Sequence, residues 1–126
     1  MPTLTASPTL GDLLKHEYDK DYCREAVLLA PGDALPAGTV LGRIASSGQY
    51  KPATATGSDG AQIACAVLLV EVAASAQPRP ALILARGPAI VSAAALSFDA
   101  SVDAEAERAE KLAQLSAHGI VARPTV

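Results

Sequence analysis

Two histidines and a short acidic run are the residues of this chain whose types could do chemistry. His16 precedes Glu17, Asp19 and Asp21, and oxygen ligands gathered in this way are what a divalent cation prefers. A metal site needs a preformed cage, however, whereas alternating charges on a polar segment are usually solvated, so we expect no metal. His118 stands at the end of a predicted helix, where the helix dipole favours an imidazolium, and we interpret it as a capping residue.

No motif of the sequence supplies a nucleophile or a phosphate-binding loop. A serine hydrolase of the common type would show G-x-S-x-G, and a nucleotide-binding loop would end in Gly-Lys-Ser/Thr. The stretch GSDG at 57–60 lacks the ligand series of a calcium loop and indicates a tight turn. Lys51 lies at a turn but lacks the apolar flanks of a biotin or lipoyl carrier. We therefore assign no catalytic residue and expect neither enzymatic activity nor a cofactor.

The two cysteines, Cys23 and Cys65, lie far apart in the sequence and form no CxxC pair. Metal and redox motifs use more closely spaced cysteines. We expect two reduced thiols that pack as small hydrophobic residues.

The composition predicts a single domain that associates with other chains. A length of 126 residues fits one domain. Apolar residues make up 50% of the chain and charged residues only 18%, below the usual quarter, and we count 27 alanines, which bury little area each. A surface with so few charges indicates that part of it is covered by another chain. We therefore expect an oligomer or a docked subunit.

Net charge and hydropathy argue against nucleic acid and membrane as partners. The net charge is −3 and the cations are scattered, whereas phosphate binding needs clustered Lys and Arg. The longest stretch without Asp, Glu, Lys or Arg, residues 87–98, is too short to span a bilayer. The first residues show neither the basic start nor the apolar stretch of a secretory signal, so we expect a soluble protein of a cytoplasm-like compartment.

The pattern from residue 24 onward predicts a mainly-β body, folded as a compact meander or a barrel-like wrap. Strands are predicted at 25–30, 39–44, 62–72, 81–86, 88–98 and 120–126. The run at 62–72 is almost continuously apolar, which is typical of a strand covered on both faces. Gly42 indicates a bulge or a close approach of another segment, and Gly57 and Gly60 a loop that needs positive φ.

One helix is predicted over about residues 103–118. Asp103 suits its N-cap, Gly119 can adopt the left-handed conformation after its end, and Glu107 and Lys111 are spaced as an i,i+4 ion pair. The apolar stripe of this helix is predicted to comprise Ala109, Leu112, Ala113 and Ser116, with Leu115 beside it.

The N-terminal segment differs from the rest of the chain. Residues 1–9 are rich in Pro, Thr and Ser and offer too little apolar area to fold alone. Leu10, Leu13 and Leu14 then follow at helical spacing, where a short helix would be marginal in isolation. This triplet suits either a docking element or a lid on the core. We predict an arm at 1–22 and a body at 23–126.

The order of four segments resembles a known family. These are GDLLKHEYDKDYCREAVLLAPGDALPAGTVLGRI, GSDGAQIACAVLLVEV, ILARGPAIV and LAQLSAHGIVAR, and together they resemble the lambda-type head decoration proteins of tailed phages. The resemblance implies a β-clip fold assembled as a homotrimer on the outside of the expanded head, at local three-fold positions. Such a trimer would hold neighbouring major capsid proteins together against the pressure of packaged DNA. It would be made in the host cytoplasm and reside on the outer surface of the virion.

The resemblance also implies that the N-terminal arm becomes ordered on the shell and pairs with capsid segments. The residues we expect to contact the capsid are Thr3, Leu4, Thr5, Leu10, Leu13, Leu14, Tyr18 and Tyr22. An alternative is a β-clip enzyme or a small-molecule or sugar-binding domain, for which the β segments offer mainly Arg43, Asp59, Arg79 and Arg86 as polar groups. A structural subunit of a non-viral shell is a further possibility.

Overall fold

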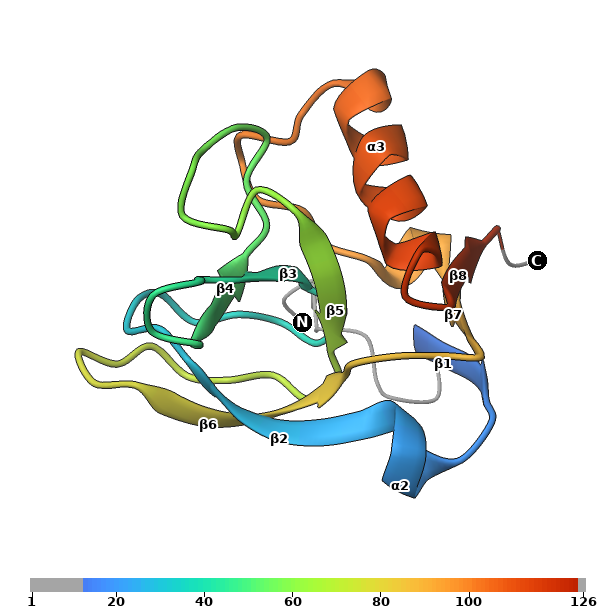
Figure 1. Ribbon diagram of the computed structural model, residues 1–126, viewed down its shortest axis with the longest axis horizontal. Helices are drawn as coiled ribbons and strands as arrows, with labels where there is room; N and C mark the ends of the chain where they lie inside the picture. The colour runs from blue at the N-terminus through green and yellow to red at the C-terminus, as the bar shows by residue number, and fades with distance from the viewer. Residues whose placement is uncertain (1–12, 125–126) are drawn as a thin grey trace, which may run out of the picture.

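The computed structural model describes residues 13–124, which form a closed five-stranded barrel, a three-stranded sheet beside it and a C-terminal helix packed across both (Figure 1). The barrel strands, in spatial order, are β2 (Arg24–Leu29), β4 (Tyr50–Pro52), β3 (Val40–Arg43), β5 (Ala64–Leu68) and β6 (Arg79–Leu84). The second sheet has the order β1 (Leu14–Glu17), β7 (Ala89–Ser92), β8 (Ile120–Arg123). The helical elements are α2 (Lys20–Cys23), the 3-10 turn η1 (Ala93–Ala95) and α3 (Glu105–Ser116). The predicted mainly-β, barrel-like body with a C-terminal helix is confirmed.

The barrel closes because β2 pairs at both of its edges. Along one edge it pairs with β6, antiparallel, over its whole length from Arg24–Leu84 to Leu29–Arg79. At its end Leu29 also pairs with Tyr50 of β4, in parallel. β3 pairs antiparallel with β4 and β5, and β5 with β6. The closing contact between β2 and β4 is thus a single residue pair.

Gly42 marks a close approach inside the barrel, as predicted. The register of β3 against β5 shifts between Leu41 and Gly42, and a Cβ on Gly42 would lie 2.3 Å from the carbonyl oxygen of Ala61. Only glycine fits at this distance, so the backbone of the β4–β5 loop can lie directly on β3. Gly57 and Gly60 have positive φ angles of 149° and 104°, which also confirms the predicted loop.

The buried apolar residues form two clusters, and β5 contributes to both. The larger cluster joins barrel, sheet and helix through residues such as Leu13, Val40, Val67, Leu84, Val91, Leu115 and Ile120. The smaller one lies among barrel strands alone and comprises Leu29, Leu41, Ala66, Leu68 and Ile83. The predicted strand covered on both faces is therefore confirmed, although it spans only residues 64–68.

The helix forms where predicted, but several details differ. Its N-cap is Ala104 and not Asp103, with the Glu107 carboxylate accepting a hydrogen bond of 3.2 Å from the Ala104 backbone nitrogen. The predicted Glu107–Lys111 ion pair does not form, because the Lys111 ammonium is buried and donates to the backbone carbonyl of Gln62. The Gly119 prediction is confirmed by its φ of 81°.

The buried face of α3 is not the predicted stripe. Lys111 and Leu115 are buried and Leu112 is half-buried, whereas Ala109, Ala113 and Ser116 are exposed. The helix packs on β5 and β8, and its Leu112 and Leu115 side chains join the larger core cluster. The small residues offered too little area to decide which face turns inward.

Two further segments differ from prediction. Leu14 begins a strand that pairs antiparallel with β7, so within the described residues the segment after Leu13 is extended and not helical. The strand predicted over 88–98 ends at Ser92, where η1 follows. None of the helices in residues 13–124 is both long enough and apolar enough to cross a bilayer.

Candidate interaction surface

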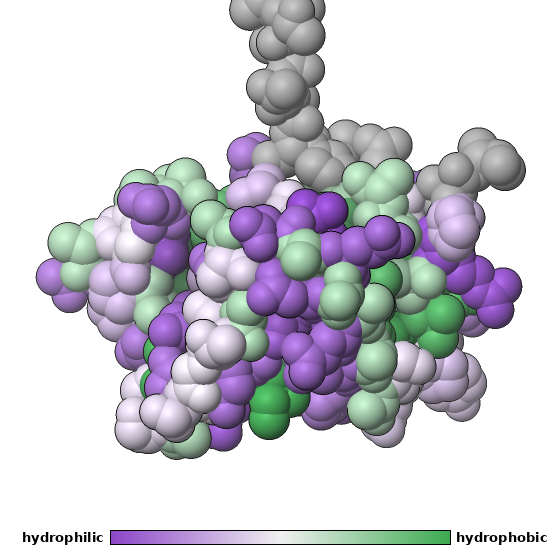
Figure 2. Space-filling model, turned by 90° about the horizontal axis from the view of Figure 1, so that it is seen from above, coloured by the Kyte–Doolittle hydropathy of each residue, from purple (hydrophilic) through white to green (hydrophobic). Residues whose placement is uncertain are grey.

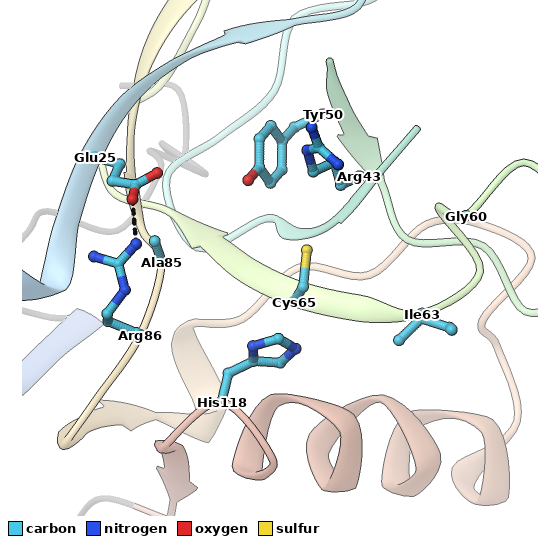
Figure 3. A pocket seen from close by; sticks show the side chains of 9 residues that line it. All are labelled: Glu25, Arg43, Tyr50, Gly60, Ile63, Cys65, Ala85, Arg86 and His118. Atoms are coloured by element: carbon cyan, nitrogen blue, oxygen red, sulfur yellow. Dashed lines mark hydrogen bonds and ion pairs between the residues drawn. The ribbon is translucent and has the colours of Figure 1, made fainter. Parts of the chain in front are cut away.

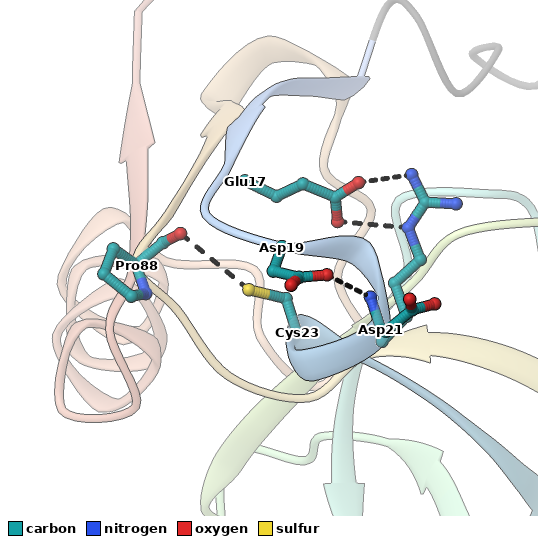
Figure 4. Close-up of polar contacts among 6 residues, drawn as sticks. Glu17, Asp19, Asp21, Cys23 and Pro88 are labelled. Atoms are coloured by element: carbon teal, nitrogen blue, oxygen red, sulfur yellow. Dashed lines mark hydrogen bonds and ion pairs between the residues drawn. The ribbon is translucent and has the colours of Figure 1, made fainter.

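The segment from Leu14 to Arg24 is attached to the body by the pairing of β1 with β7, and polar contacts within it fix its shape (Figure 4). The Arg24 guanidinium binds the Glu17 carboxylate in a bidentate manner, with distances of 2.5 and 3.0 Å, and this hydrogen bonding raises the pKa of Arg24. Asp19 caps α2 by accepting a 2.8 Å hydrogen bond from the Asp21 backbone nitrogen. The Cys23 thiol is fully buried and points to the Pro88 carbonyl, 3.9 Å away.

The acidic run at 16–21 therefore serves local structure. Glu17 pairs with Arg24 and Asp19 caps α2, while His16 lies exposed on β1. Among residues 13–124 no three His, Cys, Asp or Glu side chains are gathered so that they could hold a metal ion. The cysteines of this part of the chain are not bonded to each other.

Two exposed tyrosines stand on α2 and the turn before it. Tyr18 is 72% exposed and Tyr22 is 54% exposed, and their rings meet edge to face with centroids 6.5 Å apart. The Arg86 guanidinium lies over the Tyr22 ring at 5.4 Å from its centroid. Arg86 also donates to the Tyr22 backbone carbonyl and to the Glu25 carboxylate. The contacts of Arg86 thus fix the orientation of Tyr22.

A hollow of about 330 Å³ lies next to this aromatic pair, and Figure 3 shows its side chains grouped around one space. Its lining residues are Glu25, Arg43, Tyr50, Gly60, Ile63, Cys65, Ala85, Arg86 and His118. We call the hollow together with Tyr18 and Tyr22 the tyrosine surface. Four parts of the sequence build it: α2 with the turn before it and the start of β2, the strands β3 to β5, the segment after β6, and the turn after α3.

The chemistry of the hollow favours binding over catalysis. Burial raises the pKa of the Cys65 thiol and of the Tyr50 phenol, so neither is activated as a nucleophile or a base at neutral pH. Arg43 is exposed and makes no ion pair within residues 13–124. An unpaired guanidinium beside apolar walls suits a partner that brings a carboxylate together with apolar area.

The four polar groups of the alternative ligand-binding hypothesis do not converge on one site. Arg43 and Arg86 line the hollow, but Asp59 pairs with Lys51 at 2.7 Å. Arg79 is buried, and its guanidinium donates to three backbone carbonyls, those of Ala30, Asp33 and Ala73, at 2.7 to 2.9 Å. Arg79 is therefore committed to the fold, and of the four groups only Arg43 and Arg86 line the hollow.

The carbonyls held by Arg79 belong to two loops that form a lobe at the other end of the barrel. We call residues 30–36 and 69–76 the Glu71 lobe. The loops pair through the bridges Gly32–Ser75 and Leu35–Val72. The lobe has an apolar hollow of about 590 Å³, lined by Ala34, Leu35, Pro36, Glu71, Val72 and Ala73, and Val70 beside it is 50% exposed.

The predicted capsid-contacting residues fall into three groups. Thr3, Leu4, Thr5 and Leu10 lie outside the described residues. Leu13 is fully buried in the larger core cluster, and Leu14 is half-buried on β1 opposite Val91. Tyr18 and Tyr22 are exposed and close together. Contact of these residues with a capsid stays a prediction.

Sequence reasoning did not single out the hollow. Its residues are spread between positions 25 and 118, and no local motif joins them. The available signal was compositional, since the chain has only three tyrosines. Elsewhere, Figure 2 shows a face on which hydrophilic and weakly apolar residues are interspersed, with strongly hydrophobic residues confined to small spots.

Comparison with known proteins identifies a family. A family model described as bacteriophage lambda head decoration protein D matches residues 3–120. The matched region includes the barrel, both surfaces described above and α3. No curated protein matches the chain.

Proposed function

We propose a function from one established premise: the chain belongs to the bacteriophage lambda head decoration protein D family, whose model spans residues 3–120 of its 126. The protein is a capsid decoration, or cement, protein that transforms no substrate. It forms a homotrimer, binds the major capsid protein on the outside of the expanded head at local three-fold positions, and stabilises the shell against packaged DNA. The observation that carries this proposal is the family match over nearly the whole chain.

The positions at which the described chain enters and leaves the body support one orientation of the protein on the shell. Leu14 at the start of β1 pairs with Val91, and Arg123 at the end of β8 pairs with Ser92. Val91 and Ser92 are neighbours at the end of β7, so both flanking segments leave from the same end of the three-stranded sheet. In the proposed function this end faces the shell, and the predicted arm needs to travel only a short way to reach it.

The mode of binding that suits such an arm is strand addition. Main-chain hydrogen bonds then supply affinity while varied side chains are tolerated. One arm binds weakly because ordering it costs conformational entropy. Three arms on one trimer make the later contacts intramolecular, which raises avidity by about 10² to 10⁴.

The experiment that tests this function removes residues 1–12. Leu13 is buried and β1 pairs with β7, so a longer deletion of residues 1–22 would also damage the core. We expect the shortened protein to remain folded and trimeric but to lose co-sedimentation with expanded heads that lack decoration protein. Undiminished binding would show that residues 1–12 are not needed to bind the head. A full-length protein that does not bind such heads would refute the proposed function itself.

A further inference from the structure

We propose that the tyrosine surface of one copy of this chain receives the Glu71 lobe of a second copy. The inference rests on the proposed function, because it names the two surfaces through which the homotrimer forms. The occupant of the hollow is thus another copy of the chain, and the contact is head-to-tail.

The tyrosine surface has the composition of a protein–protein contact. All three tyrosines of the chain and two arginines, Arg43 and Arg86, gather there. Tyrosine and arginine are enriched among the residues that dominate binding energy at interfaces, particularly around pockets that a partner can fill. Ile63 at the rim is 50% exposed, which adds an apolar side chain left uncovered in the single copy.

The charges of the two surfaces are complementary. On the tyrosine surface Glu25 neutralises Arg86, whereas Arg43 makes no ion pair among residues 13–124. On the lobe, Glu71 is exposed and likewise makes no ion pair within that range. Glu71 lines the apolar hollow and follows the exposed Val70 in the chain, so the lobe offers a carboxylate together with apolar area.

The lobe is held in one shape before any partner arrives. Arg79 connects both of its loops by hydrogen bonds to Ala30, Asp33 and Ala73, and two backbone bridges join the loops further. A surface that is already ordered loses little conformational entropy when it binds. The lobe can therefore dock on the tyrosine surface of a second copy without first changing its shape.

The positions of the two surfaces favour a second copy over the shell as the partner. Tyr18 directly follows β1, so the tyrosine surface begins at the opposite end of this strand from the one where the chain enters the body. In Figure 1, α2 and the loop between β5 and β6 lie toward opposite ends of the molecule. Two different, complementary surfaces on one chain make a heterologous contact, and such a contact closes into a ring when the rotation between copies permits it.

The test exchanges the charges of Arg43 and Glu71. We expect R43E and E71R each to weaken trimer formation about 100-fold or more, because like charges then face each other across the contact. The double variant R43E/E71R restores opposite charges at every contact and is expected to return to a trimer. Sedimentation equilibrium over a range of protein concentrations measures all three, with R108E, on the exposed side of α3, as a charge-matched control expected to stay trimeric.

Each outcome decides the proposal. A trimeric R43E, or a double variant that remains monomeric while both single variants are folded, overturns it. A trimeric R43E that no longer binds expanded heads also overturns it and assigns the tyrosine surface to the shell. If R43E does not fold, as judged by circular dichroism, Y18S replaces it, since Tyr18 is 72% exposed and its loss is expected to weaken the trimer without unfolding the body. The proposed function fails separately, when the wild-type protein does not bind heads.

Discussion

The guanidinium of Arg86 covers the ring of Tyr22, with its central carbon 5.4 Å from the ring centroid. The same group donates to the Tyr22 carbonyl and to the carboxylate of Glu25 on β2. One side chain thus joins α2, β2 and the segment that follows β6. The orientation of Tyr22 and the rim of the hollow depend on it.

Replacement of Arg86 by alanine is expected to lower the free energy of unfolding by about 1 kcal/mol. The contribution is modest because the ion pair with Glu25 is more than one third exposed and is screened by solvent. R86K keeps the charge but loses the planar fork, so we expect an intermediate loss. Urea denaturation measures both, with R108A as a control. Equal stabilities of R86A and R108A would contradict the assignment.

Lys111 is expected to be a sensitive position of α3. Its side chain is 1% exposed and donates to the Gln62 carbonyl. K111A would leave a cavity and an unpaired carbonyl, at a cost of about 2–4 kcal/mol. K111M fills most of the volume and should cost clearly less. Urea denaturation compares them with K20A, at an exposed position of α2, and equal effects of K111A and K20A would refute the structural role.

G42A is expected to destabilise the barrel. The added methyl group would lie 2.3 Å from the Ala61 carbonyl oxygen, so β3 or the loop before β5 must shift. Overpacking of this kind costs about 1–3 kcal/mol. A thermal melt measures the effect, and an unchanged melting temperature would show that the two segments do not lie this close.

The Lys51–Asp59 ion pair predicts a pH dependence of stability. The hydrogen bond from Lys51 holds the pKa of Asp59 below its ordinary value. A carboxyl group whose pKa is depressed in the folded state stabilises the fold above its unfolded-state pKa, and this contribution is lost as the pH falls through the folded-state pKa. The melting temperature of D59N should therefore lie below that of the wild type at pH 7, with a difference that disappears in acid. A difference that persists at pH 2 would contradict this reasoning.

Cys65 is expected to react slowly with maleimide at neutral pH. Burial raises the pKa of its thiol, and only the thiolate is nucleophilic, so the rate should continue to rise above the pH at which a free thiol is half ionised. Cys23 has no exposed surface and should not react in the folded protein. Mass spectrometry of the labelled protein, with C65S as control, assigns the site. Faster labelling of Cys23 than of Cys65 would contradict the structure.

Local sequence signals predicted the elements that local physics determines. Glycine at positions 42, 60 and 119 indicated a close approach and two positive φ angles, all of which the backbone shows. The apolar run around β5 indicated burial on both faces, because it is almost continuously apolar. Turn chemistry and hydrophobic pattern depend on neighbours in the chain, so a sequence reveals them.

Features that depend on distant partners were not predictable in this way. Lys111 can be buried because its ammonium donates to the backbone carbonyl of Gln62. Leu14 is extended because it pairs with Val91 of β7. The hollow combines residues from positions 25 to 118, so no short segment of the sequence indicates it. Helical spacing of leucines was therefore a poor guide where tertiary pairing decided the conformation.

The pairing order of the strands determines when each sheet can fold while the chain is being synthesised. β2 emerges early from the ribosome, but its long partner β6 lies more than fifty residues later, and β1 must wait for β7. β8 then completes the second sheet only when residue 123 is available. Contacts of such long range slow folding, so the nascent chain has little opportunity to assemble piece by piece. A ribosome that stalls before β8 would release a product with β7 uncovered along one edge, a natural substrate for proteolytic quality control.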